Sequence, residues 1–182
     1  MTMRLSFELS DSDLGYFRDA LRASRNAVRD ADEFEIVEAI RDVLDEIRSN
    51  EPLPDFVALR IPQLETLIQM LTDDEWALPD TERERLLATF VYFADPEDIL
   101  PDDIPVIGYL DDVIIIELVN RELQHVREAY DDFCEFREEF DSEHGNAIDA
   151  AVRRDRLDRR RQQLHQRMKR RSAKANKSRL WS

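Results

Sequence analysis

Apolar residues recur every three or four positions over most of the chain, which is the period of helices that bury one face. The pattern predicts a helix over residues 11–29 and a second helix that Asp32 caps. Pro62 divides the next apolar stretch into a short turn and a longer helix, and Asp80 begins another helix. The longest run of this period covers residues 109–143. We therefore predict an all-α fold, a compact bundle of about five or six helices.

Residues 3–9 follow a different pattern, because apolar and polar side chains alternate there with the period of a strand. No convincing partner strand follows in the sequence, and an isolated strand is unstable. We expect this segment either to lie extended on the helical body or to pair with a second copy of the chain.

Along the predicted helix 109–143 the apolar positions keep a seven-residue spacing that is interrupted at Arg137. Packing inside the bundle explains such a stripe. The second interpretation is that the helix between residues 116 and 140 seats a partner helix or a second copy of the chain, with the half beyond Tyr130 as the contact surface. The spacing is typical of both arrangements.

Charge divides the chain into two unequal regions. Residues 151–182 hold thirteen Lys or Arg and two acidic residues, a charge of +11. Residues 1–150 hold thirteen Arg and thirty-nine acidic residues, a charge of −26, and the two regions together give the formal net charge of −15. We predict an acidic helical domain over residues 1–145 and a basic, Arg-rich tail over residues 146–182.

The basic residues of the predicted tail are the first group of candidate site residues. Guanidinium groups suit bidentate contacts with phosphate, so we expect the tail to bind RNA, the ribosome or another anionic partner. The alternative is that the tail folds back on the acidic body and neutralises it. The crowded positions are Arg153, Arg154, Arg156, Arg159, Arg160, Arg161, Arg167, Lys169, Arg170 and Arg171.

Apolar side chains are few in this tail. Leu157, Leu164 and Met168 are predicted to be too sparse to hold a helix against a core. The apolar face that they form is also smaller than a helix that binds a lipid surface requires. Trp181 is the one aromatic residue available for base stacking, so sequence-specific reading of single strands is not expected. We predict a tail that is partly helical or disordered.

A segment between residues 93 and 112 combines three prolines, six aspartates and one glycine. Asp95 followed by Pro96 is the pattern of an N-cap residue followed by proline at the first helical position. Gly108 permits a positive φ or a close backbone approach. The first hypothesis is that these aspartates accept hydrogen bonds from their own backbone. The second is a site for Mg²⁺, Mn²⁺ or Ca²⁺, with a metal-dependent enzyme as the corresponding function. Its ligands would be Asp98, Asp102, Asp111 and Asp112.

This arrangement resembles the YkvA family, a small bacterial domain of unknown function, over about residues 84–120. The resemblance implies an all-helical domain with no established reaction, whose members are soluble or membrane-associated. Glu97 and Asp103 stand where the family more often has apolar side chains, and charges there disfavour insertion into a membrane. The positions that match the family signature are Pro96, Asp98, Pro101, Asp102, Pro105, Gly108, Asp111 and Asp112.

Catalytic patterns are missing from the sequence. It contains no phosphate-binding glycine loop, no nucleophile elbow and no zinc-ligand spacing, and its three histidines are scattered. Cys134 is the single cysteine, so an internal disulfide is impossible and a reducing compartment is expected. No signal peptide or membrane span is expected from the apolar runs. We predict a cytoplasmic, non-catalytic interaction or adaptor protein that needs no cofactor apart from the hypothetical divalent cation.

Overall fold

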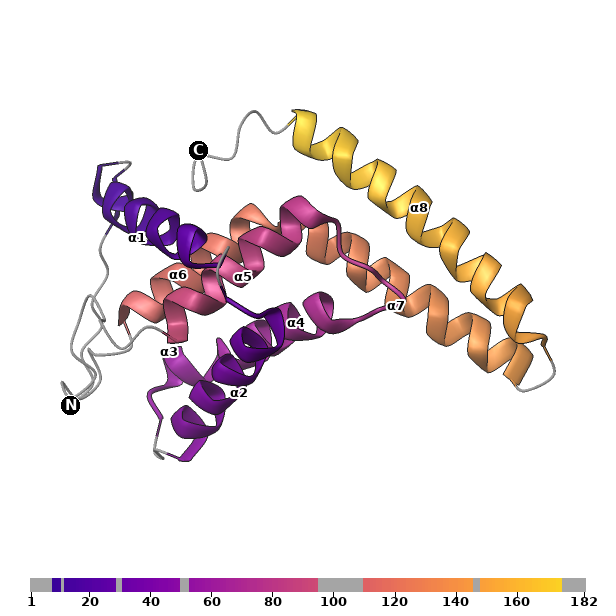
Figure 1. Ribbon diagram of the computed structural model, residues 1–182, viewed down its shortest axis with the longest axis horizontal. Helices are drawn as coiled ribbons and strands as arrows, with labels where there is room; N and C mark the ends of the chain where they lie inside the picture. Colours follow the sequence, from indigo (N-terminus) through magenta and orange to yellow (C-terminus); the bar gives the residue numbers. More distant parts are fainter. Residues whose placement is uncertain are drawn as a thin grey trace.

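The computed structural model describes residues 8–10, 12–28, 31–49, 53–94, 110–145 and 148–174. This part of the chain is all-helical and contains no strand, which confirms the predicted fold class (Figure 1). The predicted count of five or six helices is low, because the described residues form seven helices besides the four-residue α3. The helices are α1 (Asp13–Ala27), α2 (Glu33–Ser49), α3 (Asp55–Ala58), α4 (Ile61–Thr72), α5 (Asp80–Ala94), α6 (Leu110–Glu122), α7 (Gln124–His144) and α8 (Ala150–Lys174).

Local signals in the sequence set several of these boundaries. The side chain of Asp32 accepts a hydrogen bond from the Phe34 backbone N–H at 2.8 Å, which is the predicted cap of α2. Pro62 lies in the first turn of α4, where its missing N–H leaves no helical hydrogen bond unmade. The strand predicted for residues 3–9 lies outside the described residues except for Glu8 and Leu9, which have no regular structure.

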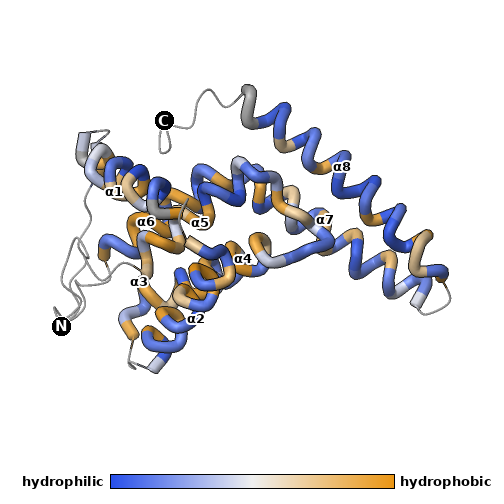
Figure 2. The backbone as a smooth tube through the Cα atoms, in the orientation of Figure 1, coloured by the Kyte–Doolittle hydropathy of each residue, from blue (hydrophilic) through white to orange (hydrophobic). Residues whose placement is uncertain are grey.

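Helix α5 occupies the centre of the core. α1 and α2 both pack against it, and Figure 1 shows it between them. Leu86, Ala88 and Phe90 are fully buried, so α5 is covered around most of its circumference. In Figure 2 the apolar segments gather where these helices meet, whereas α8 is hydrophilic along most of its length.

The prediction of one long helix over residues 109–143 is wrong in one respect, because the helical segment is divided at Leu123. The backbone there has φ −93° and ψ 11°, values outside the helical range, and α6 ends while α7 begins. Hydrogen bonds nevertheless continue across the turn, from the Leu123 N–H to the Val119 carbonyl at 2.8 Å and from the Arg127 N–H to the Leu123 carbonyl at 2.9 Å. The two helices therefore follow one another without a loop.

Helix α7 ends at Gly145, whose φ of 49° favours glycine, and α8 then runs back along α7 (Figure 1). The prediction that the three apolar residues of the tail are too sparse to hold a helix is wrong. Leu157, Leu164 and Met168 are 3, 2 and 3% exposed and belong to the main core cluster. They suffice because they lie on one face of α8, beside the half-buried side chains of Arg160, Arg161 and Arg167, whose apolar stems can cover part of that face.

The apolar stripe of α7 is packed within the chain. Tyr130, Phe133 and Phe140 are buried, and α8 packs against α7, the helix for which the sequence suggested a partner helix or a second copy of the chain. Among the described helices, none combines the length and the apolar character that crossing a bilayer requires.

Candidate functional site

The proline–aspartate segment lies mostly outside the described residues, and this includes Asp95, Asp98, Asp102 and Gly108. Asp111 and Asp112 lie in the first turn of α6, as predicted. Asp111 is 2% exposed and its carboxylate accepts a hydrogen bond from the Tyr92 hydroxyl at 3.5 Å. Within the described ranges, no group of three or more His, Cys, Asp or Glu side chains could hold a metal ion. The divalent-cation site therefore stays a prediction, because two of its four proposed ligands, Asp98 and Asp102, lie outside the described residues.

Five of the basic residues singled out in the sequence turn toward the body. Arg153 makes the most extensive contact, donating to both carboxylate oxygens of Asp141 at 2.7 and 2.8 Å and also to Glu75. Hydrogen bonds from Arg153 lower the pKa values of Glu75 and Asp141, which keeps both carboxylates ionised. Arg161 donates to the Glu75 backbone carbonyl at 3.1 Å. The inner face of α8 is defined by Arg153, Arg160, Arg161, Arg167 and Arg171 together with its three buried apolar residues.

Two further ion pairs join α8 to α7 along its length. Arg167 pairs with Asp132, and Arg171 pairs with Glu128. The guanidinium carbon of Arg160 lies 5.5 Å from the centre of the Phe136 ring, a cation–π distance. The acidic positions of α7 thus neutralise much of the charge on the inner face.

The turn between α4 and α5 anchors this hairpin to the body. Asp73 accepts hydrogen bonds from the Glu75 and Trp76 N–H groups at 3.0 Å and from the Tyr130 hydroxyl at 3.2 Å. Arg137, the residue that interrupts the apolar stripe, pairs with Asp73 at 2.9 Å and with Glu75 at 3.1 Å. Sequence reasoning missed Glu75 and Trp76, although the break at Arg137 was a signal that this position needs an acidic partner.

Trp76 is the apolar centre of this anchor and is fully buried. Its ring lies 5.6 Å from Tyr130, 5.4 Å from Phe133 and 4.6 Å from His165 of α8, between ring centres. Burial, with the nearby charges of Arg161 and Lys169, lowers the pKa of His165 from 6.5 to about 4. His165 is therefore neutral at physiological pH, as its apolar surroundings require.

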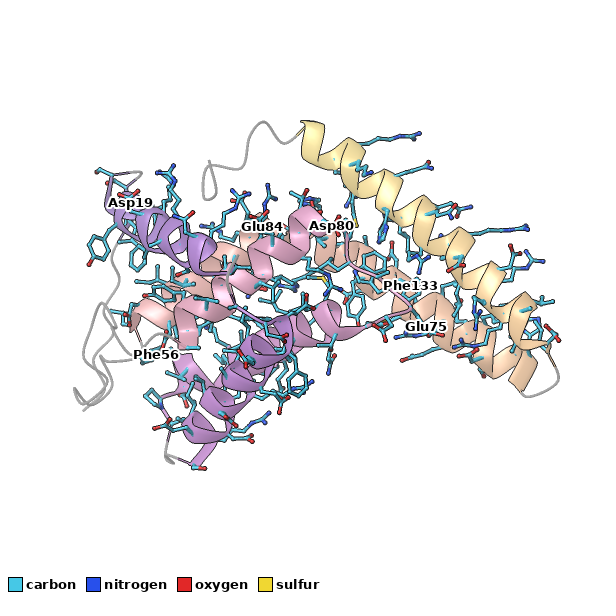
Figure 3. The ribbon with its side chains drawn as sticks, viewed as in Figure 1. Asp19, Phe56, Glu75, Asp80, Glu84 and Phe133 are labelled. Carbon is cyan, nitrogen blue, oxygen red and sulfur yellow. The ribbon has the colours of Figure 1, made fainter. Side chains whose placement is uncertain are left out.

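The opposite side of α8, its outer face, carries exposed basic residues. Figure 3 shows nitrogen-tipped side chains that extend from α8 away from α7. Arg159 pairs within the helix with Asp155 at 2.9 Å, whereas the other basic residues of this face make no ion pair with any described residue. Three glutamines, Gln162, Gln163 and Gln166, are exposed on the same helix. The exposed basic residues on this side are Arg156, Arg159 and Arg170, whereas Lys169 borders a hollow lined by residues 77–83 of the body and Arg154 is exposed at the start of α8.

Comparison with known proteins identifies one short region of similarity. A family model described as "Protein of unknown function (DUF1232)" matches residues 85–118, which include most of α5 and the first part of α6. The match covers 34 of the 182 residues, so the chain is similar to this uncharacterised domain over that segment. No curated protein and no solved structure matches the chain. The similar segment does not include α7 or α8, and it assigns no activity to the site described above.

Proposed function

We propose that this chain is a non-catalytic interaction protein whose helix α8 binds an anionic partner such as RNA, free or within the ribosome, or another polyanion. The observation that carries the proposal is the division of α8 into two faces. Carboxylates of the same chain pair with Arg153, Arg161, Arg167 and Arg171 of the inner face. The exposed Arg156 and Arg170 of the outer face have no such partner among the described residues.

Electrostatics restricts where an anionic partner can bind. The region 1–150 has a charge of −26 and repels anions, whereas residues 151–182 have a charge of +11. Screening over about 8 Å at physiological ionic strength separates the outer face of α8 from most of the acidic body. An anionic partner is therefore attracted to that face and not to the rest of the surface. Arginine predominates there, and its planar guanidinium group can contact two phosphate oxygens at once.

The test is RNA binding by the full-length chain, measured as fluorescence anisotropy of a labelled RNA. The variant combines Arg156→Gln, Arg159→Gln and Arg170→Gln, and each lost phosphate contact weakens binding, so we expect a loss of about tenfold or more. The matched control combines Arg22→Gln, Arg41→Gln and Arg121→Gln, which removes the same charge from exposed positions on α1, α2 and α6. Equal losses in the two variants, or no binding by the natural chain, would contradict the proposal.

A further inference from the structure

Charges on the outer face of α8 form two groups with glutamines between them. Arg156 and Arg159 make the first group. Arg170 makes the second, together with Lys169 at the edge of this face, beside a hollow lined by residues 77–83 of the body. At 3.6 residues per turn, these four residues and the glutamines between them fall within about half of the helix circumference. The two groups are separated by about 15 to 21 Å along the helix axis, at about 1.5 Å per residue.

We propose that this face recognises double-stranded RNA by lying across its minor groove. This inference rests on the proposed function and names its ligand. The two charged groups contact the two phosphate backbones that border the groove, and the exposed Gln162, Gln163 and Gln166 face the groove between them. Long Arg and Lys side chains can lean inward, so two groups this far apart can reach the backbones on either side of the wide minor groove of A-form RNA.

The rigidity of α8 favours a duplex over a single strand. Its inner face is fixed by Leu157, Leu164 and Met168 and by Arg153, so the outer charges are held at constant spacing. A duplex presents phosphates at equally constant positions. Single-strand binding depends on aromatic side chains on which bases stack, and residues 148–174 contain no Phe, Tyr or Trp.

The shape of the groove favours RNA over DNA. The minor groove of A-form RNA is wide and shallow, so a helix can bind there without insertion. The major groove of B-DNA is about 8.5 Å deep, and a helix that enters it brings its neighbouring elements close to the phosphates. α8 packs against α7, whose exposed Asp131, Glu135 and Glu138 would be repelled there. Glutamine amides both donate and accept hydrogen bonds, as the 2′-hydroxyl groups that line the RNA minor groove do.

The experiment compares four probes on the full-length chain: an RNA duplex of about 20 base pairs, one of its single strands, a DNA duplex of the same sequence, and heparin. The natural chain is expected to bind the RNA duplex more tightly than the single strand and the DNA duplex. The double variant Gln162→Ala, Gln166→Ala keeps every charge. We expect it to bind the RNA duplex about tenfold more weakly, because two hydrogen bonds are lost, and to bind heparin as before.

The control double variant Gln69→Ala, Gln124→Ala removes two exposed glutamines from α4 and α7 and is expected to leave all four affinities unchanged. Single-stranded RNA or duplex DNA bound as tightly as duplex RNA would overturn the inference, as would an unaltered duplex affinity of the Gln162→Ala, Gln166→Ala variant. In those cases the proposed function survives as general polyanion binding. Failure of all four probes to bind refutes the proposed function itself.

Discussion

Helices α5 and α8 are both packed against other helices, but different forces hold them. α5 buries apolar side chains on most sides, including the fully buried Leu86 and Phe90. α8 has twenty-five residues and buries three apolar ones, and its other contacts with the body are mainly ion pairs of Arg with Asp and Glu. Apolar burial is non-directional and is not screened by ionic strength, whereas partly exposed ion pairs depend on geometry, pH and salt.

The comparison shows how a strongly acidic chain can present a basic surface. If all basic residues of α8 were neutralised by the body, none could bind a partner, and if none were neutralised, the helix would have little to hold it. The structure divides them between an inner and an outer face. The first three predictions below test the difference in attachment by measuring how much stability each region contributes.

The largest effect is expected for Phe90→Ala in α5. Phe90 is fully buried, so the substitution removes a large apolar contact and leaves a cavity, at a cost of about 3–5 kcal/mol in the free energy of unfolding. Urea denaturation followed by circular dichroism measures it. Phe34→Ala is the matched control, because Phe34 is 69% exposed and its loss should cost under about 0.5 kcal/mol. Similar costs for the two variants would contradict the assignment of α5 to the core.

A smaller effect is expected for Leu164→Ala in α8. Its side chain is buried, but α8 contacts the body along one face, so we expect a cost of about 2 kcal/mol, at the low end for such substitutions. The loss should be local to the hairpin. In a Trp181→Phe background Trp76 is the only tryptophan, and its emission should shift to longer wavelength as α8 loosens from the ring. If the Trp76 emission stays unchanged at every denaturant concentration below the one that unfolds the whole chain, α8 does not loosen separately, which would contradict the expected local loss.

Glu75→Gln should cost about 1 kcal/mol, because Glu75 accepts hydrogen bonds from both Arg137 and Arg153 but is partly exposed and screened by solvent. The comparison variant is Glu138→Gln, which removes an exposed carboxylate of α7 that has no ion pair with any described residue. It should leave stability nearly unchanged. Equal effects in thermal denaturation would mean that the ion pairs contribute nothing beyond overall charge.

The smallest effect concerns pH and His165. The unfolded chain protonates this ring near the ordinary pKa of 6.5, whereas the folded chain resists protonation until about pH 4, so the contribution of this group to stability falls as the pH drops from 6.5 to 4. The lowered pKa values of Glu75 and Asp141 act in the same direction at the acid end of that range, because folded carboxylates that must be protonated lose their ion pairs. His165→Leu should show a weaker loss of stability between those pH values than the natural chain. Parallel profiles would contradict this account of the ring.

Much of the helical layout could be predicted from local signals. Asp32, Pro62 and Asp80 act on neighbouring backbone, so their effects are readable in the sequence. The turn at Leu123 could not be predicted, because its apolar side chain fits the period of both flanking helices. The docking of α8 was missed because the pattern counts apolar residues and takes no account of Arg stems or of ion pairs with distant elements.

The candidate site was predictable in composition but not in arrangement. Ten of the thirteen basic residues of the tail were singled out from the sequence, but their division into inner and outer faces depends on Glu75, Asp132 and Asp141, which come from other elements. Spacing along one helix cannot say which carboxylates of the body will face it. That information exists only in the tertiary packing.

The central claim is that the outer cations of α8 contact the phosphates of a partner, and the salt dependence of RNA affinity tests it most directly. Each phosphate contact adds about 0.7 to 0.9 to the slope of log affinity against log salt concentration. The variant with Arg156→Gln, Arg159→Gln and Arg170→Gln should therefore have a slope about 2 to 3 smaller in magnitude than the natural chain, and the variant with Arg22→Gln, Arg41→Gln and Arg121→Gln should keep the natural slope. Three identical slopes would contradict the account.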